Sequence, residues 1–260
     1  MIAIMDEVSV RDGGVNRFTL KMIAILAMAI DHIAWSFIPT SSVPGQVMHA
    51  IGRLTGPIMF FFIAEGYRHT RSVWKYLARL LLFTALSTLP FSFFETGSFT
   101  FYSFGVIYTL ALGLLAIVCY DRIQNRILSW SAIIILCILS IWGDWAFFGV
   151  ILCLLFHIFH TNFTGQLISA GVVTVSAFLL SFRNYVTSFA FSSISMQRGT
   201  EEAMRLGIVS NLFVVGIVLP VILLRFYNGK SGEKPWSRWF FYIFYPAHLL
   251  LLGFLKYYVF

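Results

Sequence analysis

The hydrophobic residues of this chain occur in long runs that short polar segments separate. Most runs have about 20 residues, the length that an α-helix needs to cross the roughly 30 Å hydrocarbon core of a bilayer. The Leu, Ile and Phe residues within the runs do not alternate strictly with polar residues, which favours helices over the strands of a transmembrane barrel. The pattern therefore predicts an all-α fold, a polytopic bundle of membrane helices.

The runs predict nine membrane spans, near residues 20–38, 50–67, 76–94, 104–120, 127–142, 145–159, 166–182, 206–224 and 239–255. Residues 185–195 form a run of about 11 residues, which is too short to cross a bilayer. We therefore expect residues 183–205 to form an interfacial or re-entrant segment, with ten spans if this run does cross. No internal repeat or low-complexity linker divides the chain, so residues 1–260 are predicted to form one integral-membrane domain.

Composition supports a lipid environment. Hydrophobic residues make up 59% of the 260 residues and charged residues only 11%, whereas about 25% of the residues in soluble domains are charged. The lipid bilayer is therefore the expected partner of the outer surface. We expect no cleavable signal peptide, since the first 19 residues are polar and the first apolar run contains Asp31 and His32 and has no small-residue cleavage site.

Charge orients the predicted bundle. The net charge is +7, and most Lys and Arg residues lie between the spans. A cytoplasmic N-terminus, with residues 1–18 as a cytoplasmic segment, places most of these residues inside, in agreement with the positive-inside rule. Because topology accounts for the basic residues, we do not expect nucleic acid as a partner. We expect a multi-pass membrane protein.

Ionisable residues inside the apolar spans are the candidates for a catalytic role. Asp31 and His32 lie about 15 Å beyond Lys21 along the first span, near the bilayer midplane. A charge there costs on the order of 2.5 to 3.5 kcal/mol on insertion scales, so the pair needs polar partners or water. One interpretation is a hydrogen-bonding pair between helices. The other is a general base, His32, whose tautomer Asp31 fixes.

Two further candidates reach a similar depth. Arg53 lies in the outer half of the second span, where it either pairs with Asp31 or donates to a substrate phosphate or an oxyanion, and these roles are compatible. His248 follows Pro246 in the last span, and a proline inside a helix frees a carbonyl and kinks the backbone. The candidate catalytic residues are therefore His32, Asp31, Arg53 and His248.

The inner end of the second span is basic. Glu65, Arg68 and His69 are spaced i, i+3 and i+4, and Arg71 follows. One interpretation is a solvated helix end that obeys the positive-inside rule. The other is a basic mouth that holds phosphates. The Cys and His residues show no metal-ligand spacing, so we expect no metal.

Five segments resemble those of a known family: LKMIAILAMAIDHIAW, IGRLTGPIMFFFIAEGYRHTR, SFGVIYTLALGLLAI, GDWAFFGVILCLLF and FFYIFYPAHLLLLGFL. Together they resemble the TraX family over most of the chain, and the most specific parts are Asp31-His32 and the run from Gly52 to Arg71. TraX of conjugative F-type plasmids is known for acetylating the amino terminus of pilin. The family looks related to transmembrane acyltransferases that take acetyl-coenzyme A from the cytoplasm.

The resemblance implies a membrane-embedded acetyltransferase that moves an acetyl group from cytoplasmic acetyl-coenzyme A to an amine or hydroxyl at or across the membrane. It also implies a multi-pass protein of the bacterial cytoplasmic (inner) membrane. His32 is then the base or the acyl carrier, and Arg53 or His248 stabilises the oxyanion. The implied phosphate-binding residues are Arg68, His69, Arg71 and Arg122. The acceptor stays open, because the amino terminus of a pilin-like peptide and a glycan both suit this chemistry.

Two other functions remain open at this point. In a proton-coupled transporter, Asp31, His32 and His248 would form a proton relay and Arg53 a gate. In a scaffold subunit, the buried polar residues would contact only one another.

Overall fold

The computed structural model describes residues 13–101, 103–192, 208 and 211–259, and the side chains of 184–192 and 238 are outside the description. The helices are α1 (Arg17–Phe37), α2 (Val43–Gly52), α3 (Thr55–His69), α4 (Val73–Thr96), α5 (Val106–Arg122), α6 (Arg126–Leu139), α7 (Ala146–Ile158), α8 (Phe163–Ser192), α10 (Leu219–Leu224) and α11 (Ser237–Phe254). Short 3-10 segments η1 (Ser140–Trp142) and η2 (Leu212–Val218) and a π-helical end η3 (Leu255–Val259) complete them. Over these described residues, the predicted all-α fold is confirmed.

Five helical stretches are long and apolar enough to cross a membrane, Arg17–Phe37, Val43–His69, Val73–Thr96, Phe163–Arg183 and Trp239–Val259. Each overlaps a predicted span. Other apolar helices are shorter, and α7, with 13 residues, is only about 20 Å long. The chain is therefore a helical membrane protein by the length and composition of these helices. The nine-span topology and the side on which the N-terminus lies stay predictions.

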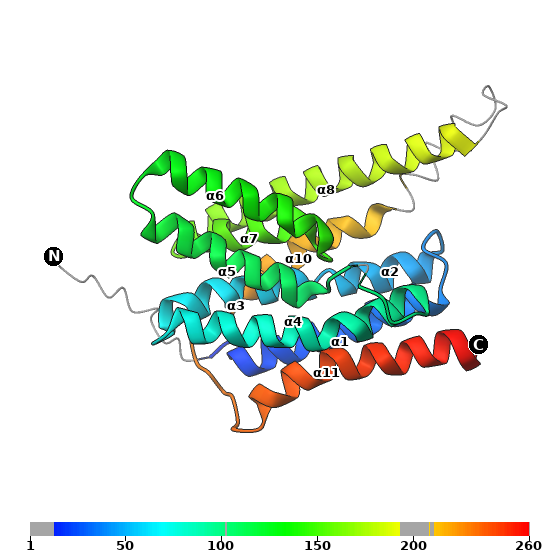
Figure 1. The fold of residues 1–260 in the computed structure, drawn as a ribbon, viewed down its shortest axis with the longest axis horizontal. Coiled ribbons are helices and arrows are strands. Elements are labelled where there is room, and N and C mark those ends of the chain that lie inside the picture. Colours follow the sequence, from blue (N-terminus) through cyan, green and yellow to red (C-terminus); the bar gives the residue numbers. More distant parts are fainter. Residues whose placement is uncertain (1–12, 102, 193–207, 209–210, 260) are drawn as a thin grey trace.

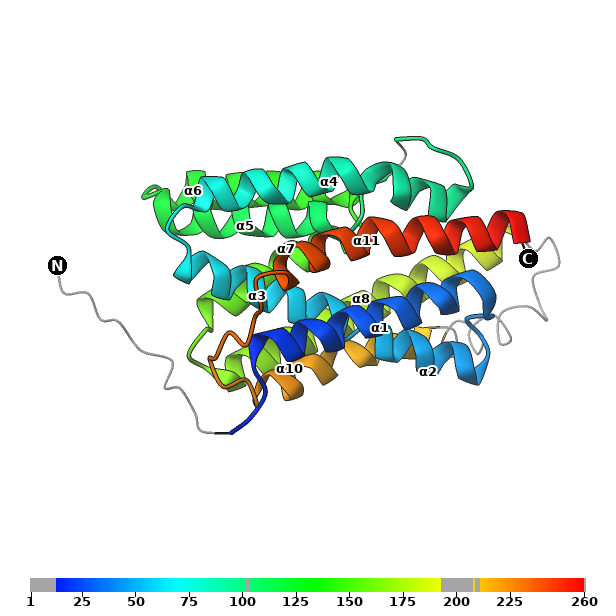
Figure 2. The ribbon, with the colours of Figure 1, turned by 90° about the horizontal axis from the view of Figure 1, so that it is seen from below.

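The helices lie roughly along one common direction, with their connections at the two ends of the molecule (Figures 1 and 2). In both views α11 runs beside α1, and it also packs along α4. Large apolar side chains remain exposed on the outside of the bundle, for example Leu26, Ile134 and Val172, which are 58%, 58% and 59% exposed. Such a surface suits contact with lipid.

The second predicted span, 50–67, is the C-terminal part of a longer, broken helix. α2 already begins at Val43, where the Ser42 side chain accepts a hydrogen bond from the backbone N–H of Gly45. The segment Pro44-Gly45 indicates a turn by its residue types, yet proline is well tolerated in the first turn of a helix. The break at Arg53-Leu54 then separates α2 from α3.

The seventh predicted span ends too early. α8 continues without interruption from Phe163 to Ser192, so residues 183–192 extend this helix and do not begin a separate segment. Residues 193–205, the rest of the predicted interfacial segment, lie outside the described residues. The interfacial placement itself stays a prediction.

Candidate functional site

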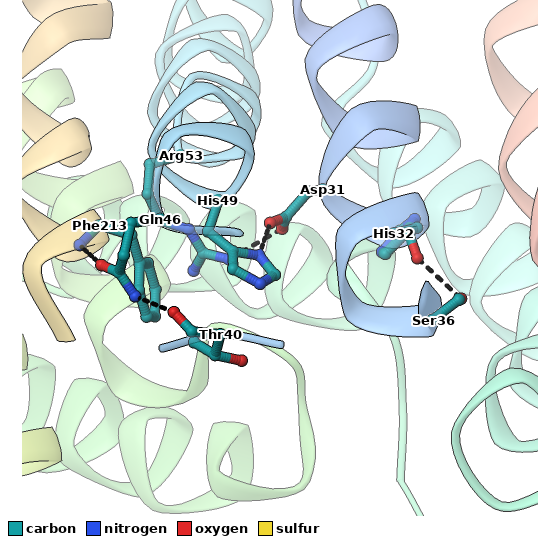
Figure 3. Close-up of polar contacts among 8 residues, drawn as sticks. All are labelled: Asp31, His32, Ser36, Thr40, Gln46, His49, Arg53 and Phe213. Atoms are coloured by element: carbon teal, nitrogen blue, oxygen red, sulfur yellow. Dashed lines mark hydrogen bonds and ion pairs between the residues drawn. The ribbon is translucent and has the colours of Figure 1, made fainter. Parts of the chain in front are cut away.

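Asp31 is the centre of a polar cluster between α1 and the α2–α3 break (Figure 3). Its Oδ1 accepts a hydrogen bond from Nδ1 of His49 at 2.7 Å, and its Oδ2 accepts one from the Arg53 guanidinium at 2.8 Å. Asp31 is 8% exposed and His49 is fully buried. The predicted ion pair between Asp31 and Arg53 is confirmed, and it balances a carboxylate that would be costly in an apolar interior.

Gly52 makes this cluster possible. A Cβ atom at position 52 would overlap Cβ and Cγ of Asp31, so only glycine lets α2 approach α1 this closely. On the other side, the Arg53 guanidinium lies 5.3 Å from the Trp145 ring centroid and 5.1 Å from that of Phe213. The faces of such aromatic rings attract a cation electrostatically.

His49 was not among the predicted site residues. Its spacing of i, i+4 to Arg53 on one helix was the available signal, because two such residues share a helix face. The His49 ring packs 4.3 Å from the Trp35 ring, and its Nε2 has no hydrogen-bond partner within the described part of the chain. Gln46 holds the neighbouring η2 in place, because its Oε1 accepts from the backbone N–H of Phe213 at 2.8 Å (Figure 3).

His32 belongs to a second polar centre on another face of α1. Its Nδ1 lies 2.7 Å from Nε2 of His248 on α11. The interpretation in which Asp31 fixes the tautomer of His32 is wrong, because both carboxylate oxygens bond to other residues. Consecutive residues of a helix project about 100° apart. Asp31 and His32 therefore face different neighbours, as Figure 3 shows.

A backbone carbonyl fixes the protons of both imidazoles. Nδ1 of His248 lies 2.8 Å from the carbonyl oxygen of Phe244. A carbonyl only accepts, so Nδ1 of His248 carries a proton, and in the neutral ring its Nε2 is an acceptor. Nδ1 of His32 must then donate to it, which leaves Nε2 of His32 with a free lone pair. A neutral His32 in this arrangement can act as a base or a nucleophile.

The imidazole pair has apolar surroundings. His32 and His248 are each 8% exposed. The Phe94 ring lies 5.1 Å from His32, and the Phe244 ring stacks on His248 at 4.8 Å. Such walls exclude water, which strengthens polar interactions inside and protects reactive groups from hydrolysis.

A cavity of about 370 Å³ lies between α1, α3, α4, α5 and α11. One end is basic, with Arg17, Lys21, His69, Arg79 and the acid Glu233 in its lining, and the other end includes Met28, Thr55, Val106, Ile107 and Tyr245. Met28 lies one helical turn before His32, and the Tyr245 ring is 5.8 Å from the ring of His248. The cavity therefore leads from a basic mouth to residues that neighbour the imidazole pair, and neither imidazole is itself part of the lining.

Of the four predicted phosphate-binding residues, His69 lines this cavity. Arg68 instead pairs with the buried Glu65, and Arg71 and Arg122 are exposed and outside the lining. The roles predicted for them stay predictions.

The cavity adds three basic residues, Arg17, Lys21 and Arg79. Arg17 and Lys21 begin an i, i+4, i+7, i+8, i+11 stripe along α1 that ends at Met28. This helical period was visible in the sequence.

Two comparisons with known proteins found similar sequences. The family model described as TraX protein matches residues 16–256. The chain is also 31% identical over 245 residues to the probable fimbrial assembly protein FimC, serogroup H1, of Dichelobacter nodosus, a match that covers 91% of this chain and 94% of the relative. No solved structure matches the chain. The extent of the family match and of this relationship shows that the chain belongs to the TraX family.

Proposed function

We propose that this protein is a membrane-embedded acetyltransferase that uses acetyl-coenzyme A as its acyl-donor substrate. The observation that carries the proposal is the cavity that extends from a basic mouth to Met28 and Tyr245, which neighbour the His32–His248 pair. An acyl-coenzyme A has phosphates at one end and a thioester at the end of a long, mostly uncharged arm. The cavity has the matching order of charge and apolar surface.

The lining fits the donor at both ends. Arg17, Lys21 and Arg79 supply cationic groups where phosphates would lie. Beyond them, the walls are mostly apolar, with Ile25, Met28, Phe62, Ile63 and Leu80 among the lining residues. The volume of about 370 Å³ falls in the range of about 300–1,000 Å³ that is usual for small-molecule sites.

The chemistry follows from the tautomers. When bound, acetyl-coenzyme A supplies an activated acyl group. His32 Nε2 carries the lone pair that takes a proton from the acceptor or itself attacks the acyl carbon, and His248 holds the imidazole in this tautomer. Asp31 and Arg53 neutralise each other beside it and fix the α1–α2 contact.

The proposed topology places acyl-donor binding on one side of the membrane. With the proposed cytoplasmic N-terminus, the basic mouth at the start of α1 opens toward the cytoplasm, where acetyl-coenzyme A is available. The multi-pass topology in the inner membrane is part of this proposal. The relative is a probable fimbrial assembly protein, so we propose a pilus-related role and the amino terminus of a pilin-like subunit as the first acceptor to test.

The first experiment uses purified protein with labelled acetyl-coenzyme A and a pilin-like peptide that has a free amino terminus. We expect wild-type protein to release coenzyme A and label the peptide, and His32→Ala to lose both activities. Undiminished release by His32→Ala would remove His32 from the mechanism. Substrate uptake into proteoliposomes without any acyl-donor cleavage would favour the proton-coupled transporter instead.

A second experiment tests the donor cavity. We expect the double variant Lys21→Glu/Arg79→Glu to weaken coenzyme A binding at least about 10-fold, because it places two like charges against the phosphates. The matched variant Arg71→Glu/Arg122→Glu makes the same change of charge outside the cavity lining. A larger loss in this second variant would favour the phosphate site predicted from the sequence over the cavity.

A further inference from the structure

Acyl transfer from a thioester requires a hydrogen-bond donor for the oxygen that becomes negative. Neither residue predicted for this role lines the cavity. One Nη nitrogen of the Arg53 guanidinium bonds to Asp31 between α1 and α2, and His248 uses its Nδ1 proton on the carbonyl of Phe244 and its Nε2 as the acceptor for His32. An oxyanion formed in the cavity therefore needs a donor from the cavity lining.

Thr55 and Tyr245 are the hydroxyl side chains at the deep end of the cavity, and that of Thr55 donates to the carbonyl of Ala24. Tyr245 lies one helical turn before His248 on α11. Tyr245 is 4% exposed, and the centroid of its ring is 5.8 Å from that of the His248 ring. The side chain thus lies beside the imidazole pair and lines the space proposed for the acyl group.

The tyrosine hydroxyl is oriented by the start of α5. The backbone N–H of Val106 donates to Oη of Tyr245 at 3.2 Å. Because Oη accepts this bond, its own hydrogen can point elsewhere, and among the described residues the structure shows no hydrogen bond in which this hydroxyl is the donor. Accepting from a backbone N–H polarises a hydroxyl and makes it a stronger donor.

Gly105 permits this contact. A Cβ atom at position 105 would overlap Oη of Tyr245, so a larger residue would push the hydroxyl away from the helix end. Val106 and Ile107 also line the cavity, and the positive end of the α5 dipole adds to the field at this point. The buried hydroxyl, the cavity and the close approach at Gly105 are separate observations that agree.

We propose that Tyr245 is the oxyanion donor of the acyl transfer. This role rests on the proposed function. A nucleophile, either Nε2 of His32 or an acceptor whose proton His32 takes, forms a bond to the thioester carbonyl carbon, and the carbonyl π electrons move to oxygen. Tyr245 donates a hydrogen bond to that oxygen and keeps its proton. The oxyanion then re-forms the carbonyl as the C–S bond breaks, and the coenzyme A thiolate leaves. The thiolate takes up the proton that the acceptor loses, which the His32 imidazolium delivers when His32 is the base.

The variant Tyr245→Phe tests this role, because it removes one hydroxyl and keeps the ring. Loss of one oxyanion donor lowers kcat by roughly 100- to 1,000-fold in other enzymes, and we expect that loss here with coenzyme A affinity unchanged within about 3-fold. The control is Tyr108→Phe on α5, which also removes a hydroxyl, one that donates to the carbonyl of Leu139 and lies outside the cavity lining. We expect it to retain wild-type kcat.

A spectroscopic measurement tests the hydrogen bond without turnover. The probe is a coenzyme A ketone in which one CH₂ group is inserted between the sulfur atom and a ¹³C-labelled acetyl carbonyl. In isotope-edited infrared spectra, we expect the bound carbonyl to absorb at lower frequency than the free probe in wild-type protein. This shift should disappear in Tyr245→Phe and persist in Tyr108→Phe. An unshifted carbonyl in the wild type overturns the role of Tyr245, even if the variant does not fold.

The two proposals fail in different ways. If wild-type protein does not release thiol from acetyl-coenzyme A, both the acetyltransferase function and the role of Tyr245 are overturned. If the wild type releases thiol and folded Tyr245→Phe does so at the same rate, only the role of Tyr245 is overturned.

Discussion

The hydrogen bond from His32 to His248 determines which nitrogen of His32 is reactive, and substitution of His248 tests this directly. In His248→Phe, a phenyl ring replaces the imidazole, so an aromatic ring is retained but the acceptor for Nδ1–H of His32 is lost. The proton then either stays on Nδ1 without a partner or moves to Nε2. Movement to Nε2 removes the lone pair on which base or nucleophilic chemistry depends.

The size of the effect follows from the lost bond. A buried donor without a partner costs about 1–3 kcal/mol, and each 1.36 kcal/mol changes a rate about tenfold. We therefore expect His248→Phe to release coenzyme A about 5- to 160-fold more slowly than wild-type protein. The matched variant His248→Gln places an amide oxygen where it can accept from His32, and we expect it to recover most of the rate.

The assay is the initial rate of thiol release from acetyl-coenzyme A, measured on protein whose fold is verified by its thermal transition in detergent. Histidine ¹⁵N spectra give an independent readout, in which His32 of the wild type should show the tautomer with a protonated Nδ1. A wild-type rate in folded His248→Phe would refute the tautomer argument. A rate for His248→Gln as low as that for His248→Phe would show that the imidazole ring, and not its acceptor, is required.

Two further predictions concern the fold around this site. Gly52→Ala should destabilise the protein by about 1–3 kcal/mol, the usual cost of overpacking, because the new methyl group overlaps Asp31. An unchanged thermal transition would contradict the close α1–α2 contact. In a cysteine-free background, Gln124→Cys in the α5–α6 connection and Phe101→Cys in the α4–α5 connection should be labelled by an impermeant maleimide from opposite sides of the membrane, with Gln124→Cys on the cytoplasmic side. Labelling of both from one side would refute the predicted topology.

Much of the helical pattern could be predicted because apolar runs of membrane length form helices wherever water is absent. The boundaries were less certain where turn-forming residues occur inside helices. Pro44 and Gly45 suggested a loop, but Ser42 caps the helix in front of them and α2 begins at Val43. The continuation of α8 through Ser192 was missed because Arg183 and Asn184 interrupt the apolar pattern, and the run after them, residues 185–195, is too short to cross a bilayer by itself.

The candidate site was predicted in part. Residues that are costly in lipid stand out in a sequence, so Asp31, His32, Arg53 and His248 could all be identified by their type and depth. Their partners could not, because hydrogen bonds across the bundle depend on how helices far apart in sequence pack. Both imidazoles that bond to the Asp31-His32 pair come from other helices, His49 from α2 and His248 from α11.

In the structure, His248 and not Asp31 is the partner of His32. This difference from the prediction has a chemical consequence. A carboxylate next to an imidazole favours the imidazolium form, which has no lone pair for base or nucleophilic chemistry. In the structure the carboxylate is occupied by His49 and the permanently charged Arg53, whereas the partner of His32 is an imidazole whose own tautomer a carbonyl fixes. His248 can therefore orient His32 without placing a negative charge beside it, so the arrangement in the structure serves a membrane-embedded base better than the one predicted from the adjacent Asp31.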